Sequence, residues 1–158
     1  MSQKTKTGGD DLKTSLAKLE DTLEMYLVDK APFQMPESAK EFLVKYGPWL
    51  IVVMLVMAIP MVLFALGLGA IVAPFAILAG VGAGVGFGFA MIFTLAMMAL
   101  EVIALPGLFN RKVSSWRLMF YASLLGGVQS LVTFNLGGLI IGTGLSLYIL
   151  FQIKSYYK

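Results

Sequence analysis

The chain contains one long stretch without charge, which runs from Gly47 to Leu100. These 54 residues include no Asp, Glu, Lys or Arg. A helix needs about 20 apolar residues to cross the hydrocarbon core of a bilayer. The stretch is therefore too long for one span and long enough for two spans with a connection. It predicts an integral membrane protein of the all-α class.

Composition supports this class and removes most kinds of chemistry. Hydrophobic residues make up 58% of the chain and charged residues 13%, whereas soluble domains carry roughly 25% charged residues. The chain has no Cys and no His, so it lacks thiolate nucleophiles, the commonest metal ligand and the commonest general base. We expect no enzyme activity and no catalytic residue, cofactor or metal site. A row of Met54, Met57 and Met61 offers soft ligands for Cu(I), but flexible packing explains it better.

The N-terminal third predicts two amphipathic helices. We expect residues 1–9 to be a disordered tail and residues 10–47 to form two interfacial helices on the cytoplasmic side, the second one ended by Gly47-Pro48. In the first helix, apolar side chains recur at spacings of four and three, at Leu12, Leu16, Leu19, Leu23 and Tyr26. This helix either lies on the membrane or on its own protein, or pairs with a second helix as a coiled coil.

The rest of the chain, 48–158, predicts a transmembrane domain of four helices. The spans are expected at about 49–68, 80–105, 116–133 and 139–153. The apolar segment 67–79 between the first two spans is expected to be re-entrant or a tightly packed connection. Side chains suited to the membrane–water interface are Trp49, Trp116 and Tyr156.

Basic residues predict the orientation. They lie before Trp49, at Arg111–Arg117 and at Lys154–Lys158, whereas the connections 67–79 and 134–138 have none. By the positive-inside rule, both termini and the middle loop are cytoplasmic, which requires two spans on each side of that loop. The net charge of +3 placed beside the spans favours anionic lipid headgroups and no nucleic acid as partner.

Small residues recur at helical spacing in three of the spans. Such rows let helix backbones approach closely in a bilayer. A flexible, poorly helical segment is the alternative at residues 80–88, because each glycine disfavours helix by about 1 kcal/mol. The predicted helix-packing positions are Gly80, Gly84, Gly88, Gly126, Gly138 and Gly142.

Glu101 is the last acidic residue of the chain and lies near the cytoplasmic end of the second span. Its expected partners are Arg111, Lys112 and Arg117, in a structural ion pair. A proton- or ion-handling role is the alternative. Gln129, near the middle of the third span, is expected to hydrogen-bond another helix.

Four runs of sequence resemble a known family. They are APFQMPESAKEFLVKYGPW (31–49), LPGLFNRKVSSW (105–116), FYASLL (120–125) and LYILFQIKSYYK (147–158). They resemble a family of small, uncharacterised bacterial four-span membrane proteins, some members of which carry a chromate-transporter label. The resemblance implies the same topology in the inner (cytoplasmic) membrane and no established activity.

Three functional hypotheses remain open. The first is a non-enzymatic subunit that packs against copies of itself or against other membrane proteins. The second is a small homo-oligomeric transporter or channel whose path is lined by Glu101, Gln129 and a broken segment around Pro74. The third is a membrane-shaping protein that acts through its N-terminal amphipathic helices.

Overall fold

The structure is a computed structural model that describes residues 8–79 and 81–158, without the side chains of 72–74, 76–79, 81–85 and 87. Every regular element in these ranges is helical, which confirms the all-α class. Most of the predicted disordered tail lies outside the described residues. Gly8 and Gly9, however, already belong to the first helix.

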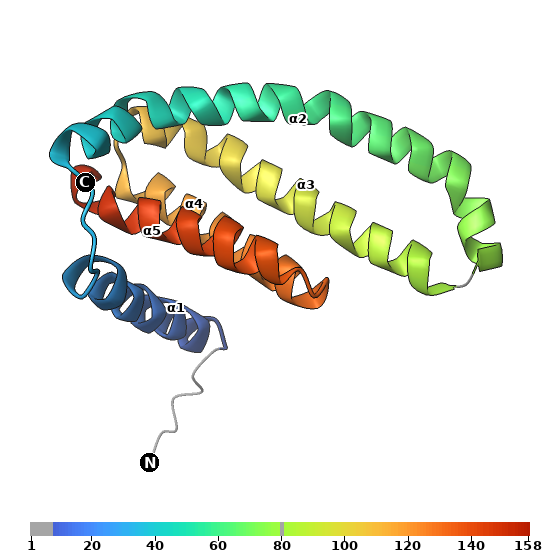
Figure 1. Ribbon diagram of the computed structural model, residues 1–158, viewed down its shortest axis with the longest axis horizontal. Coiled ribbons are helices and arrows are strands. Elements are labelled where there is room, and N and C mark those ends of the chain that lie inside the picture. The colour runs from blue at the N-terminus through green and yellow to red at the C-terminus, as the bar shows by residue number, and fades with distance from the viewer. Residues whose placement is uncertain (1–7, 80) are drawn as a thin grey trace, which may run out of the picture.

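Five α-helices form a long hairpin and a short hairpin, with the first helix attached to one end (Figure 1). The first helix, α1 (Gly8–Glu24), continues as a π-helical turn, η1 (Met25–Asp29). The long hairpin is α2 (Glu37–Ala79) and α3 (Val81–Phe109). The short hairpin is α4 (Val113–Val132), the π-helical segment η2 (Gly138–Thr143) and α5 (Gly144–Gln152). A 3₁₀ turn, η3 (Lys154–Tyr156), follows α5.

Helix α2 corrects three expectations at once. Its 43 residues pass through Gly47-Pro48, Pro60 and Pro74 without a break. The predicted end of an interfacial helix at Pro48 is therefore wrong, and so are the non-helical connection at 67–79 and the broken segment at Pro74. Gly-Pro ends many helices in water because water can hydrogen-bond the backbone groups that proline leaves free. An apolar environment offers no such partner and therefore favours a backbone that stays helical.

Two helices are long and apolar enough to cross a membrane, at Glu37–Ile71 in α2 and at Gly88–Phe109 in α3. The segment Gly138–Gln152 is apolar but shorter. α2 turns one stripe toward α3, and this stripe has alternate spacings of four and three, as in a coiled coil. Its less exposed members are Val44, Pro48, Ile51, Leu55, Ala58, Val62 and Ala65.

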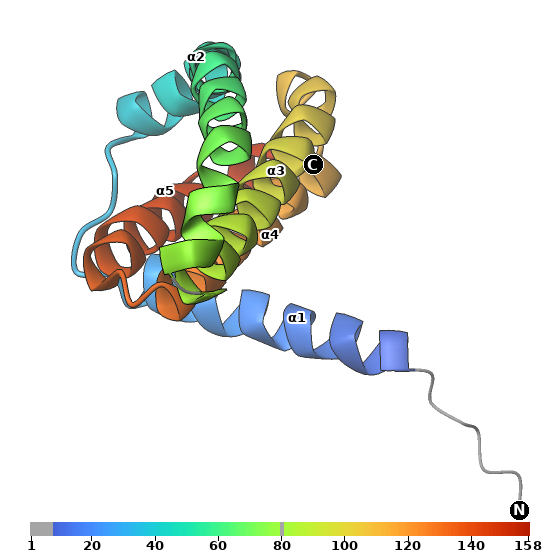
Figure 2. The same cartoon turned by 90° about the vertical axis from the view of Figure 1, so that its right-hand side faces the viewer.

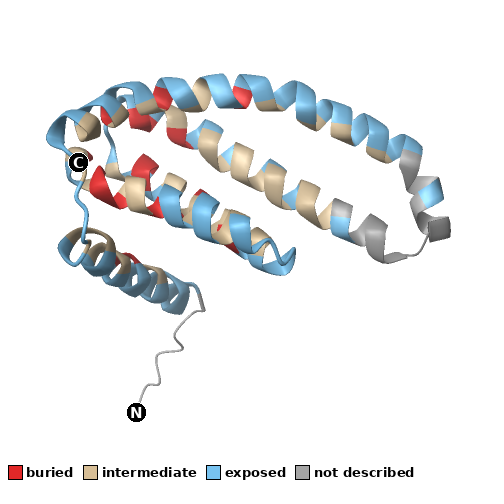
Figure 3. Ribbon diagram, viewed as in Figure 1, coloured by how far each residue is buried: buried red, intermediate tan, exposed pale blue. Residues whose placement is uncertain are grey.

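The core lies at the end of the molecule where both hairpins are open, as the buried residues in Figure 3 show. Its centre is aromatic: Trp116 stacks on Phe120, and Phe151 meets both rings edge-on. The Trp116 side chain is fully buried, and its Nε1–H donates to the Leu150 carbonyl oxygen at 2.7 Å. Trp116 is therefore a core residue and not the interface anchor that its position near a helix start predicts.

The three basic regions of the sequence meet at this same end. The Lys158 N–H donates to the Arg111 carbonyl at 2.9 Å, and the Val113 N–H donates to the Lys158 carbonyl at 3.0 Å. The Tyr156 hydroxyl donates to Glu37 Oε2 at 2.8 Å, which ties the C-terminal segment to the start of α2. The long hairpin extends far beyond the short one at the opposite end (Figure 1).

Candidate functional site

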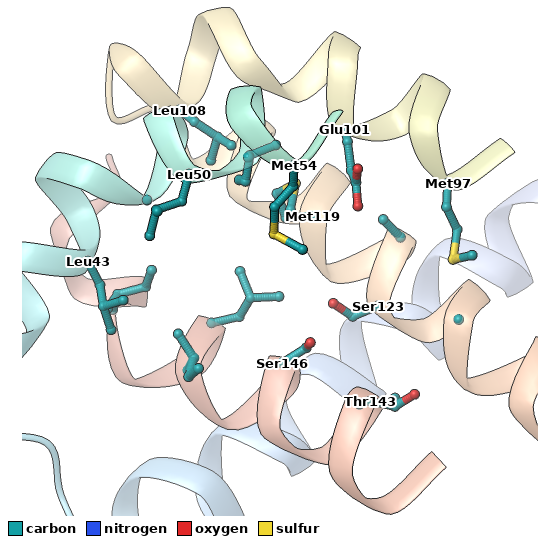
Figure 4. Close-up of a pocket in the computed structure, with 18 of the residues that line it drawn as sticks. Leu43, Leu50, Met54, Met97, Glu101, Leu108, Met119, Ser123, Thr143 and Ser146 are labelled. Carbon is teal, nitrogen blue, oxygen red and sulfur yellow. The ribbon is translucent and has the colours of Figure 1, made fainter. Parts of the chain in front are cut away.

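A cavity of about 570 Å³ lies between the two hairpins. Side chains from α2, α3, α4, η2 and α5 line it, so neither hairpin forms it alone. Figure 4 shows Glu101 pointing from α3 into this space, beside Met54 of α2 and across from Ser123 of α4. The sequence placed Glu101 and Gln129 on a common path, and both line the cavity.

Glu101 does not form the ion pair that the sequence predicts. Eight helical positions, about 12 Å, separate it from Phe109 at the end of α3, and Arg111 and Lys112 lie beyond that end. Arg117 pairs with Glu20 of α1 instead. Within the described residues, Glu101 is half-buried and has no cationic partner.

The cavity has one polar wall and one apolar wall. The polar wall is a set of hydroxyl and amide groups on the short hairpin, namely Ser123, Gln129, Ser130, Thr143 and Ser146. The Gln129 side chain forms no hydrogen bond to another described residue, so the predicted helix–helix bond is not present. The apolar wall comes mainly from the long hairpin and includes Leu50, Met54 and Met97.

The methionine row does not assemble into a metal site. Met54, Met57 and Met61 are 70%, 66% and 72% exposed, and Met54 also borders the cavity. In the described parts of the chain, no group of three or more acidic, Cys or His residues is close enough to hold a metal ion.

The predicted packing glycines differ in the space around them, and Gly126, Gly138 and Gly142 line the cavity. A Cβ at Gly126 would lie 3.3 Å from Met97 Sδ, and one at Gly138 would meet Asn135 and Ser130. A Cβ at Gly88 or Gly142 would have no described atom within 4 Å. Gly80 lies outside the described residues, and so do the surroundings of Gly84.

The closest helix approach within the short hairpin uses a glycine that the sequence reasoning passed over. A Cβ at Gly127 would lie 3.0 Å from Thr143 Cγ2. Gly127 directly follows the predicted packing position Gly126, and helical spacing alone does not say which of two adjacent glycines faces the neighbour.

A second polar cluster attaches α1 to the bundle, and the sequence reasoning missed it. We call Glu20, Glu24, Arg117 and Lys154 the N-terminal anchor. Lys154 Nζ lies 2.9 Å from Glu20 Oε1 and 2.6 Å from Glu24 Oε2, and Arg117 Nε lies 3.4 Å from Glu20 Oε2. Glu20 is buried although it lies off the leucine stripe. Two acids four residues apart share a helix face and favour a basic partner, but they do not identify it.

The anchor favours the charged form of Lys154. Burial of its ammonium acts to lower the pKa of Lys154, but hydrogen bonds to Glu24 and Glu20 and the charges of both carboxylates outweigh this effect. The pKa of Lys154 is therefore raised above its ordinary value. Hydrogen bonds from Gln152 to the Leu27 carbonyl and from Tyr148 to the Phe33 carbonyl continue the attachment along η1 and the connection to α2.

Because α1 turns its acidic face toward the bundle, much of its leucine stripe stays outside. Leu12 is 66% exposed and Tyr26 57% exposed, while Leu16 and Leu23 are half-buried. Figure 2 shows α1 lying across the bundle rather than along it. The outer face of α1 is therefore apolar and exposed.

No family model, curated protein or solved structure matches this chain. The resemblance of residues 31–49 and 105–158 to four-span bacterial proteins therefore stays a prediction. A function is inferred from the cavity, from the space at Gly88 and from the N-terminal anchor.

Proposed function

We propose that the protein is a non-enzymatic, four-span subunit of a membrane assembly, made of copies of itself or of other membrane chains. The observation that carries this proposal is the outer surface of the long hairpin. Its α2 side chains are largely exposed, and the Cβ position of Gly88 on α3 meets no described atom. Glycines in a bilayer allow a second helix to approach closely.

The lengths of the helices support four spans joined in an assembly. The 20 residues of α4 cover about 30 Å, which is the thickness of the hydrocarbon core. The 15 residues Gly138–Gln152 cover only about 22 Å. A helix that is too short for its bilayer is accommodated by local thinning or by association with other helices.

The meeting of the basic segments at one end supports an inner-membrane protein with both termini in the cytoplasm. Because the chain has no Cys, a cysteine introduced at Asn110 tests this directly. A membrane-impermeant maleimide should label it from the cytoplasmic side alone. Labelling from the outer side would refute the orientation.

The assembly itself is tested by particle mass in a mild detergent, with co-purifying chains identified. Gly88→Leu should reduce the mass by releasing the partner, while the melting temperature of the monomer stays within a few degrees. Gly127→Leu is the matched control, because its neighbour Thr143 lies in the same chain. That variant should lower the melting temperature of the chain itself, and it should not release a stable monomer. An unchanged particle mass for Gly88→Leu would refute the proposed contact.

Transport is the second candidate function, and the cavity favours it. A carboxylate without a cationic partner faces a space between two hairpins, and such groups in membrane proteins mark the paths of ions and substrates. The continuous helix at Pro74 takes no part in this candidate. Flux through liposomes that contain the purified protein tests it, with Glu101→Gln as the inactive variant.

A further inference from the structure

We propose that the cavity between the hairpins binds a lipophilic organic cation, with its charge against Glu101 and its apolar body against α2. The inference deepens the second candidate function, transport, by naming the class of ligand. Binding does not require translocation, so the two can fail separately. A ligand that binds and is not carried would refute transport and leave the site intact.

The sign of the charge comes from Glu101. After Glu41 it is the one acidic residue in the chain, and none of the described basic residues pairs with it. An ionised carboxylate in an apolar setting requires a counter-charge or a proton. A cationic ligand provides the counter-charge, whereas an anion would meet repulsion from the same carboxylate.

The choice of an organic over an inorganic cation comes from the walls. Inorganic cations such as Ca²⁺ take six to eight oxygen ligands, several of them carboxylates, and the cavity contains one carboxylate. Much of the rest of the lining is leucine and methionine, and Met54 of α2, Met97 of α3 and Met119 of α4 adapt to ligands of irregular shape. The volume of about 570 Å³ falls within the range of about 300–1,000 Å³ found for sites of small organic ligands.

The polar wall completes the site. Ser123 and Ser146 present hydroxyl groups from α4 and α5, opposite the apolar side (Figure 4). Hydroxyl oxygens accept hydrogen bonds from a protonated amine, so a primary or secondary ammonium is held at two places. A quaternary cation has no N–H group to donate, so the Glu101 carboxylate alone holds its charge.

The test is saturable binding of radiolabelled tetraphenylphosphonium to the full chain in mild detergent. We expect one site per chain and a dissociation constant at least about tenfold weaker in Glu101→Gln, because opposite charges in a partly desolvated site attract strongly. Glu41→Gln, which removes an exposed acid of the same charge, should leave the dissociation constant unchanged. Tetraphenylborate, an anion of the same shape, should not compete.

A second variant keeps the Glu101 charge and fills part of the cavity instead. Gly142 lines the cavity and has no described atom within 4 Å of a Cβ. Gly142→Leu should therefore fill part of the space, weaken binding and leave the melting temperature unchanged. Binding that is absent in the parent, equal in parent and Glu101→Gln, or displaced equally by tetraphenylborate would overturn the proposal.

Discussion

The short hairpin with its C-terminal turn contains most of the core, although the long hairpin contains most of the helix. Seven of the eleven buried apolar residues in the described chain follow Val113, and four belong to α2 and α3. Yet α2 and α3 have 43 and 29 residues, against 20 in α4 and 9 in α5. Most apolar side chains of the long hairpin face outward, whereas those of the short hairpin face one another.

This difference separates two tasks within one small chain. The short hairpin holds the tertiary structure together through aromatic packing and also holds α1 through the N-terminal anchor. The long hairpin, in the function that we propose, offers its exposed surface to lipid or to another chain. Substitutions in the first should therefore change stability, and substitutions in the second should change association.

The largest expected effect is that of Trp116→Ala. The variant removes a fully buried indole and leaves the Leu150 carbonyl without its donor, so it should lose about 3–5 kcal/mol of unfolding free energy. Trp49→Ala is the control on α2, where the indole is 59% exposed and contacts Phe109. It should lose about 0.5–1.5 kcal/mol. Unfolding in mixed micelles measures both, and equal losses would refute the contrast between the hairpins.

Lys154→Met should have the next largest effect. It leaves the buried Glu20 with Arg117 alone and should destabilise the docked α1 by about 1–3 kcal/mol, below the value for a fully buried pair because water screens this one. Faster amide exchange in α1, with unchanged exchange in α4, would show it. Lys13→Met on the exposed side of α1 should change neither. Slow exchange throughout α1 in Lys154→Met would mean that the anchor does not hold the helix.

Alkaline pH should weaken the same attachment more gradually. Hydrogen bonds to Glu24 and Glu20 and the charges of both carboxylates raise the pKa of Lys154 above its ordinary value. When the folded pKa is the higher one, the stabilisation is complete below the unfolded pKa and is lost as the pH rises through the folded pKa. A spin label at Asp21→Cys should become mobile as the pH rises above 10.5, the ordinary pKa of lysine. A label at Met57→Cys on α2 should not respond.

The smallest effect compares one glycine from each hairpin. Gly67 on α2 has no described atom near its Cβ position, so Gly67→Ala should stabilise the helix by about 0.5–1 kcal/mol. Gly127 on α4 has Thr143 Cγ2 at 3.0 Å, so Gly127→Ala should cost about 1 kcal/mol through overpacking. Melting temperatures in detergent measure the two changes. Shifts of the same sign would contradict the idea that the short hairpin is more closely packed than the outer surface of α2.

What the sequence predicts well is what depends on local pattern. The uncharged stretch predicts membrane helices, and the predicted segments 80–105, 116–133 and 139–153 lie close to Val81–Phe109, Val113–Val132 and Gly138–Gln152. The break at Gly47-Pro48 is wrong because proline rules drawn from water do not transfer to an apolar environment that offers the backbone no other partner.

What the sequence does not predict depends on partners that are distant in the chain. Glu20 meets Arg117 and Lys154 from the far end of the sequence, and nothing in the helical pattern of α1 identifies them. Trp116 matches the sequence pattern of an interface residue. Its burial depends on the Leu150 carbonyl, 34 positions later, which accepts its N–H. The cavity likewise requires both hairpins, so Glu101 alone could suggest a polar site but not its walls.

The span of 130 positions between Glu24 and Lys154 also sets an order of events during synthesis. Ribosomes add about 5–20 residues per second, so α1 exists for roughly 6–26 s before its lysine partner has been made. Until Lys154 has been made, Arg117 is the basic residue of the N-terminal anchor that can pair with Glu20. The contacts of α1 with Lys154 therefore form only after Lys154 has been made, later than the helices α2, α3 and α4.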